Sequence, residues 1–403
     1  MADNFVEYDY LIVGAGLFGA TCANLLTKAG KKCLVLDKRD HIAGMAYTQE
    51  VEGIVVHKYG PHIFHTNDEL VWKYVNRFAK FNRFTNCPIA KYKDEVYNLP
   101  INMNTFYRLW DVVNPNQARM MVEAQVKEYL KEYERQKPQR FRKGKVFRPE
   151  NLEEQAILMF GTDIYNKIIK EYSEKKWGKK VTKLPPEIAG HLTLRYDYNN
   201  DYYDDMYQGI PVGGYTEMVR KMLLGIEVRL GKDFFANRKE WETKAYKIIY
   251  SGPLDEFYDC CYGKLEYTTL RYEEEVLELP DYQGNAVVYY TSDDVPYTRI
   301  IEHKYFEAPR HRQQMTYVYD EPRFQGSPVP QRTVITREYS QEFHKGMEPL
   351  YPVNDKYNEG VAGLYMDKAK KENRVFIGGR LGSYKYYNMA EVIKEAMELV
   401  RGI

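Results

Sequence analysis

The first forty residues alternate between short apolar runs and a helical spacing of apolar positions. YLIV (10–13) and CLVL (33–36) are apolar runs of strand length, as expected for buried strands. Between them, apolar residues recur at helical intervals over residues 20–26, and Gly30 ends this helix. The pattern predicts a strand–helix–strand unit of a parallel sheet.

The last thirty residues predict a further strand and helix joined by a glycine turn. VFI (375–377) predicts a buried strand, Gly378 and Gly379 a turn, and residues 390–400 a helix. Because both ends of the chain supply glycine turns to one sheet, we expect them to build a single discontinuous domain.

The middle of the chain divides into a helical part and a strand-like part. Apolar residues have near-helical spacing over 102–135 and 150–175. Four later segments have strand-like patterns: KIIYSGP (247–253), AVVYYTSD (286–293), QMTYVYD (314–320) and RTVITREY (332–339).

Composition excludes some classes of protein. A chain of 403 residues predicts about two or three domains, and a formal net charge of +1 gives no field that would drive binding to nucleic acid or a membrane. No apolar run reaches membrane-span length, and the N-terminus does not resemble a signal peptide. Five cysteines, an odd number without metal-type spacing, favour reduced thiols in the cytoplasm. The 38 tyrosines are unusual, and we expect many to line polar pockets or an interface.

The first apolar run leads into a dinucleotide-binding motif. Gly14, Gly16 and Gly19 form G-x-G-x-x-G, and Asp37 ends the next strand about 20 residues later. The glycines allow a tight turn, a close approach of backbone to a pyrophosphate, and close helix–strand packing. The helix N-terminus attracts the phosphates, and Asp37 can accept from the ribose hydroxyls.

The motif alone does not distinguish NAD from FAD. Gly44, just after the second strand, could let the backbone approach a second part of a long cofactor, and Arg380 could pair with a pyrophosphate. A glycine turn at each end of the chain suits an elongated cofactor, so we favour FAD. The remaining residues that we assign to the cofactor are Phe18, Lys38, Gly60, His62, Gly379 and Met389.

The segment HKYGPHIFHT (57–66) places His57, His62 and His65 within nine residues. This density suggests a metal site, but the segment contains no Cys, Asp or Glu at ligand spacing. We therefore predict no metal.

Longer segments resemble the flavin-dependent UDP-galactopyranose mutases almost from end to end. The matching strings are GAGLFGA (14–20), YGPHIFHTN (59–67), NLPIN (98–102), YQGIPVGGYT (207–216), VPYTRIIEHK (295–304), YPVND (351–355) and GRLGSYKY (379–386). The resemblance implies a mixed α/β fold with three parts. These are a Rossmann-like FAD-binding domain (1–90, 225–265 and 370–403), a helical bundle (100–190) and a twisted antiparallel sheet (191–224 and 266–369).

The resemblance also implies a redox-neutral reaction on a nucleotide-sugar substrate. N5 of reduced FAD attacks the anomeric carbon and expels UDP, the sugar ring opens and closes as a furanose, and UDP returns. The family is further expected to form homodimers.

The resemblance assigns roles to individual residues. Arg299 matches a diphosphate-binding arginine, His62 is the candidate for contact near flavin N5, and His191 occupies the position of a second, mobile arginine. His65 is expected to support the loop by hydrogen bonding, and His57 to be structural. The residues assigned to the substrate are Asn86, Tyr172, Trp177, Tyr202, Tyr351, Tyr386 and Asn388.

Several positions depart from the family pattern. His191 replaces an arginine, Asn388 an aspartate, Ile168 an aromatic residue and Tyr289 an asparagine. These changes concern the nucleotide-sugar end, so we expect FAD binding to persist. The simplest expected reaction interconverts UDP-galactopyranose and UDP-galactofuranose, and the changes leave open another nucleotide or sugar. The alternatives are a mutase for another nucleotide sugar, a FAD oxidoreductase of amine-oxidase type, and a non-catalytic flavin-binding protein.

Overall fold

The computed structural model describes residues 6–141, 147–307, 331–344 and 346–403. The predicted strand 314–320 lies outside them. Within the described residues, no helix is long and apolar enough to cross a membrane.

The two ends of the chain build one parallel sheet, as the apolar runs predict. All neighbouring strands are parallel, in the order β16 (Val375–Ile377), β10 (Ala245–Tyr250), β1 (Tyr8–Val13), β2 (Cys33–Leu36) and β9 (Glu227–Arg229). The short connections after these strands place several loops at one edge of the sheet, where α/β proteins bind ligands.

Helices cover both faces of this sheet. One face packs on α1 (Leu17–Lys28), α2 (Glu69–Val75), α8 (Gly214–Met222) and α14 (Met389–Gly402). The other packs on α9 (Arg238–Thr243), α10 (Leu254–Phe257) and α12 (Lys356–Ala369). Helices α8 and α12 come from segments that we expected with the antiparallel sheet, so the boundaries of that division remain a prediction.

A second sheet joins distant parts of the chain. Its order is β15 (Tyr351–Pro352), β11 (Tyr267–Leu277), β14 (Thr333–Gln341), β13 (Arg299–Glu302), β12 (Val287–Tyr290), β6 (Ile89–Tyr92) and β7 (Glu95–Asn98). All pairs are antiparallel except β12 with β6. Two small antiparallel pairs complete the strands: the hairpin of β3 (Thr48–Val51) and β4 (Ile54–His57), and the distant strands β5 (Phe64–Thr66) and β8 (Tyr207–Gly209).

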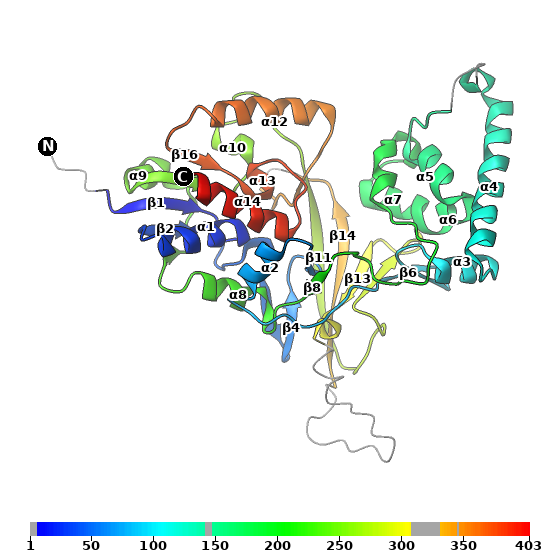
Figure 1. Cartoon of the computed structure of the whole chain (residues 1–403), viewed down its shortest axis with the longest axis horizontal. Coiled ribbons are helices and arrows are strands. Elements are labelled where there is room, and N and C mark those ends of the chain that lie inside the picture. Colours follow the sequence, from blue (N-terminus) through cyan, green and yellow to red (C-terminus); the bar gives the residue numbers. More distant parts are fainter. Residues whose placement is uncertain (1–5, 142–146, 308–330, 345) are drawn as a thin grey trace, which may run out of the picture.

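The expected helical part is a separate bundle with more breaks than its spacing suggested. It contains α3 (Met103–Trp110), α4 (Pro115–Gln136), α5 (Leu152–Phe160), α6 (Thr162–Ile164), a π-helical turn (Tyr165–Ile169) and α7 (Lys170–Trp177). Asp111 takes a left-handed conformation that ends α3, and Gly161, with φ +80°, separates α5 from α6. Figure 1 shows the parallel sheet on the left, the bundle on the right, and β11 and β14 between them.

Close packing at the start of α1 generates the first prediction. A Cβ at Gly19 would lie 1.9 Å from the carbonyl oxygen of Gly14, whereas one at Gly360, an exposed position of α12, would meet no atom within 4 Å. We expect Gly19→Ala to cost about 1–3 kcal/mol through overpacking and to lower the thermal midpoint. Gly360→Ala is the matched control and should leave the midpoint unchanged or raise it. Equal midpoints for the two variants would contradict this account of the turn.

Candidate active site

The glycine motif forms a tight turn between the end of β1 and the N-terminus of α1, which we call the cradle. Gly14 has φ +114°, and a Cβ there would lie 2.1 Å from Oγ of Ser251. Gly16 precedes α1 without a side-chain cap, so the N–H groups of the first turn remain available to a ligand. A Cβ at Gly44 would lie 3.1 Å from Cα of Gly16, so the two backbones touch. This arrangement fits a dinucleotide pyrophosphate.

Asp37, at the end of β2, holds the cradle together. Its buried carboxylate accepts hydrogen bonds from the N–H groups of Ala15 (2.8 Å) and Arg39 (2.9 Å). Lys38 instead forms an ion pair with Glu348 at 3.2 Å, at the surface. Asp37 therefore supports the glycine turn, and its contact with a ribose stays a prediction of the motif.

The other end of the chain closes the same cradle. A Cβ at Gly378 would lie 2.3 Å from the ring of Phe18, and Gly379 has φ +80° beside the same ring. Met389 begins α14 and is buried in the core below. The structure thus brings together the N- and C-terminal residues that we assigned to the cofactor.

The histidine loop is held by imidazole–backbone hydrogen bonds. His57 Nδ1 accepts from the N–H of His62 (3.1 Å), and the N–H of His57 donates to Nδ1 of His303 (3.2 Å). His62 Nδ1 lies 2.8 Å from the carbonyl oxygen of Gly60. Because a carbonyl only accepts, we assign the proton of His62 to Nδ1, which leaves a lone pair on Nε2.

The described residues contain no group of three His, Cys, Asp or Glu side chains placed to hold a metal. His65 instead pairs with Asp205 at 2.6 Å and stacks on Tyr203, with ring centroids 3.8 Å apart. These contacts give His65 a supporting position. His62 instead lies close enough to Arg380 and Arg299 for both charges to add to burial in lowering its pKa.

Arg299 is the centre of the second half of the site. It lies on β13 directly opposite Glu338 on β14, and its Nη2 is 2.6 Å from Glu338 Oε2. Its Nη1 donates to the hydroxyl of Tyr289 (3.3 Å), and its buried Nε has no partner among the described residues. Burial disfavours the charge, but Glu338 outweighs this and raises the pKa of Arg299.

Gly60 joins the histidine loop to this pair. With φ +93°, it presents backbone where a Cβ would lie 3.4 Å from Glu338 Oε2 and 3.5 Å from Arg299 Nη2. The hydroxyl of Tyr272 donates to the carbonyl of Tyr59 (3.0 Å) beside it. The loop that carries His62 is therefore packed directly against the buried arginine.

Tyrosines surround Arg299. Tyr351 and Tyr386 stack at 4.7 Å, and the Arg380 guanidinium lies 4.7 Å from the Tyr351 ring. Tyr172 meets Tyr289 edge-on at 5.8 Å. Burial raises the pKa of Tyr386 to about 12, so its phenol stays protonated near neutral pH and can donate a hydrogen bond.

Other assigned residues have different positions. Asn86 is buried, and its carbonyl oxygen accepts from the N–H of Tyr202 (2.8 Å), so it positions that tyrosine through the backbone. Asn388 caps α14 by accepting from the N–H of Glu391 (2.9 Å). Trp177 ends α7 and is 37% exposed. His191 ends a 3-10 helix (Pro186–His191), and its side chain lies outside the described part of the structure.

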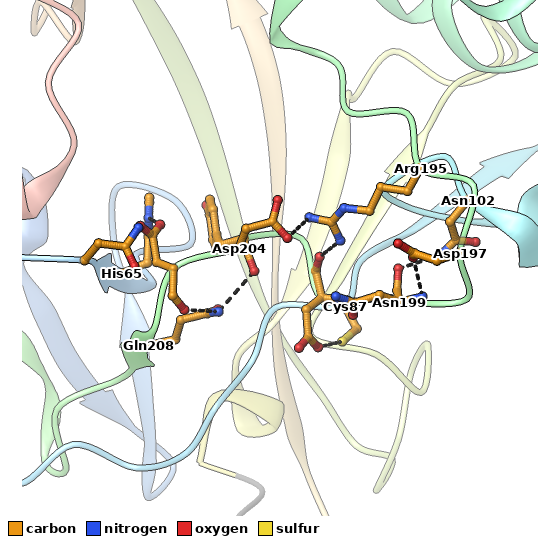
Figure 2. Close-up of polar contacts among 12 residues, drawn as sticks. His65, Cys87, Asn102, Arg195, Asp197, Asn199, Asp204 and Gln208 are labelled. Atoms are coloured by element: carbon orange, nitrogen blue, oxygen red, sulfur yellow. Dashed lines mark hydrogen bonds and ion pairs between the residues drawn. The ribbon is translucent and has the colours of Figure 1, made fainter.

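Tyr202 and Tyr203 lie on the linker between the bundle and β8, which begins at Arg195 and is held in place by side-chain contacts. Figure 2 shows Arg195 reaching along it: Nη2 lies 2.6 Å from Asp204 Oδ1, and Nη1 donates to the carbonyl of Asp201. Cys87 contacts Asp201 at 3.5 Å. Arg195 is thus held within the linker by these two contacts.

Sequence reasoning missed three residues that surround Arg299 and the histidine loop: Tyr203, Tyr272 and Glu338. Glu338 lies in RTVITREY, where alternation marks one face of a strand, but only the register of β14 against β13 identifies its partner. Tyr203 and Tyr272 carried no local signal among so many tyrosines.

Three buried histidines generate a prediction on pH. Burial lowers the pKa of His57 well below its usual value, that of His62 to about 4 and that of His303 to about 3. As pH falls below about 6.5, the unfolded chain takes up protons that the folded chain does not. Each such histidine then lowers the free energy of unfolding by up to about 1.4 kcal/mol per pH unit.

The test compares thermal midpoints between pH 7.5 and 5 for the native chain and for His303→Asn, whose amide oxygen can still accept from His57. The midpoint of this variant should depend less steeply on pH. His344→Gln, which removes an exposed imidazole, is the control. Parallel curves for the native chain and His303→Asn would refute the linkage.

Comparisons with known proteins agree with this geometry. Residues 167–386 match the family model described as UDP-galactopyranose mutase, and residues 12–78 match an NAD(P)-binding Rossmann-like domain. The chain is 35% identical to a dTDP-fucopyranose mutase of Escherichia coli, over 96% of both chains. It is 34% identical to a probable UDP-galactopyranose mutase of Klebsiella pneumoniae, over 96% of this chain and 92% of that one.

Solved structures show the same fold. The crystal structure of a reduced UDP-galactopyranose mutase superposes with a TM-score of 0.67 at 14% identity and covers 98% of this chain and 94% of that one. With the family model spanning more than half of the chain and relatives matching nearly all of it, the protein is a member of the UDP-galactopyranose mutase family.

Proposed function

We propose that the protein interconverts the pyranose and furanose forms of a nucleoside-diphospho-hexose, with reduced FAD as cofactor. The observation that carries the proposal is Arg299, a partly buried arginine whose buried Nε has no partner among the described residues, beside protonated phenols and the His62 loop. A FAD oxidoreductase has no use for such a diphosphate-binding group.

The residues at the edge of the parallel sheet suit FAD. The cradle of Gly14, Gly16 and Gly44 would hold the pyrophosphate, and Asp37 the adenosine ribose. When bound and reduced, FAD supplies the nucleophile, N5, for the anomeric carbon of the sugar. His62 would contribute the lone pair of its neutral imidazole near the flavin ring, because Arg380 and Arg299 add to burial in keeping its pKa low.

The chain's own contribution to the reaction is to stabilise the departing nucleoside diphosphate. Arg299 remains charged and faces the site, where negative charge develops on the leaving oxygen. The hydroxyls of Tyr202, Tyr351 and Tyr386 can donate hydrogen bonds without adding positive charge. The diphosphate can therefore leave and return without being held too tightly.

The substrate is a nucleoside-diphospho-hexopyranose of one of two kinds. UDP-galactopyranose follows from the family, and dTDP-fucopyranose from the Escherichia coli relative. Tyr289 and Ile168 depart from the family pattern, and Tyr289 contacts Arg299 directly, which favours a change at the nucleotide end. A homodimer and a cytoplasmic location belong to the same proposal, the latter supported by five cysteines that are all described and unpaired.

Turnover under reducing conditions tests the reaction. The purified, dithionite-reduced protein is incubated with UDP-galactopyranose and with dTDP-fucopyranose, and products are followed by NMR. We expect furanose product from at least one of them, and none without reductant. Flavin reduction by the sugar nucleotide itself would indicate an oxidoreductase, and bound flavin without product would indicate a non-catalytic protein.

Arg299 is tested by Arg299→Lys, which keeps a charge for Glu338 but loses the planar fork. We expect kcat to fall by about 100-fold, the usual effect of removing one donor from a developing oxyanion. Arg337→Lys is the matched control, because Arg337 precedes Glu338 on β14 and pairs with Glu275 at 2.6 Å. Flavin content and thermal midpoint report on folding, and an unchanged kcat would exclude the assigned role.

A further inference from the structure

Two consecutive lysines at the end of α7 have different surroundings. Lys175 Nζ donates to three backbone carbonyls, those of Tyr290 (2.8 Å), Ser292 (2.8 Å) and Val295 (3.0 Å), so it fastens α7 to the loop after β12. Lys176 has no hydrogen bond or ion pair with any described residue. Its Nζ lies 5.7 Å from the Trp177 ring.

The position of Lys176 on the helix directs it toward the arginine. Lys176 follows Tyr172 by one helical turn, so both lie on the same face of α7. Tyr172 contacts Tyr289, whose hydroxyl accepts from Arg299. Figure 1 shows α7 on the side of the bundle that faces the sheet containing β14, the strand of Glu338.

Lys176 lies close enough to Arg299 and Glu338 for their charges to affect its pKa. Lys176 is exposed at the surface, but protein atoms lie around its ammonium group. Partial loss of water is the largest cause that lowers the pKa of Lys176, and the charge of Arg299 is the second. The charge of Glu338 acts in the opposite direction. Glu338 already compensates much of the charge of Arg299. A bound diphosphate adds two negative charges, which Arg299 alone does not neutralise. Lys176 is available for this purpose because it has no carboxylate partner among the described residues.

We propose that Lys176 is a second cation for the substrate, binding the diphosphate of the nucleotide sugar opposite Arg299. The inference rests on the proposed function, since it takes the ligand to be a nucleoside diphosphate. A flexible ammonium with three donors can follow the diphosphate as it leaves and returns, which a planar guanidinium fixed by Glu338 cannot. Trp177, the next residue, places an aromatic ring beside the same position.

Ligand binding by the flavin-loaded protein tests the proposal without turnover. Dissociation constants for UDP, dTDP, uridine and thymidine are measured by calorimetry. Lys176→Met should weaken binding of the two diphosphates by about tenfold or more, because a charge-assisted hydrogen bond is lost, and should change binding of the nucleosides little. Lys176→Arg should recover most of the loss.

Lys179→Met is the matched control, since it removes the same charge three residues along the chain, beyond the end of α7. The proposal is overturned if Lys176→Met binds the diphosphates within about twofold of the native chain, or if nucleosides lose as much affinity as diphosphates. It is also overturned if the native chain binds neither diphosphate. Lysine-dependent binding without furanose product would support this assignment and reject the proposed reaction instead.

Discussion

The pairing of Arg299 with Glu338 is the interaction on which the site depends. A partly buried guanidinium is stable only when its charge is compensated, and the register of β13 against β14 supplies the carboxylate directly opposite. Gly60 lies beside the same carboxylate and guanidinium, and its φ of +93° is a left-handed conformation that favours glycine. One cross-strand pair thus sets the charge beside the loop that carries His62.

A second constraint is the close contact of distant backbones. The turn after β1 meets the loop at Gly44, and Phe18 fills the space above Gly378. These contacts exist only after the two ends of the chain have joined one sheet. Binding of a long cofactor along this edge would therefore stabilise a domain that is discontinuous in the sequence.

Sequence patterns over a few residues predicted the elements that depend only on local turns and apolar spacing. The glycine motif, the strands around it and the C-terminal unit follow from spacing and turn chemistry over a few residues, and the structure has them at the expected positions. Arg299 and the substrate tyrosines came from the resemblance to a family. The breaks at Asp111 and Gly161, the capping role of Asn388 and the pairing of Glu338 could not be predicted, because they depend on backbone conformation or strand register rather than on apolar spacing.

The linker from Arg195 to Gln208 has a mechanical consequence. At one end, the N–H of Arg195 donates to the carbonyl of Ile101 beside the bundle, and at the other, Asp205 pairs with His65 beside the parallel sheet. Tyr202 and Tyr203 lie between these two anchors. A rotation of the bundle relative to the parallel sheet would therefore displace both tyrosine side chains together. Movement of the bundle away from the parallel sheet would then also move the hydroxyl group of Tyr202, one of those proposed to hold the diphosphate.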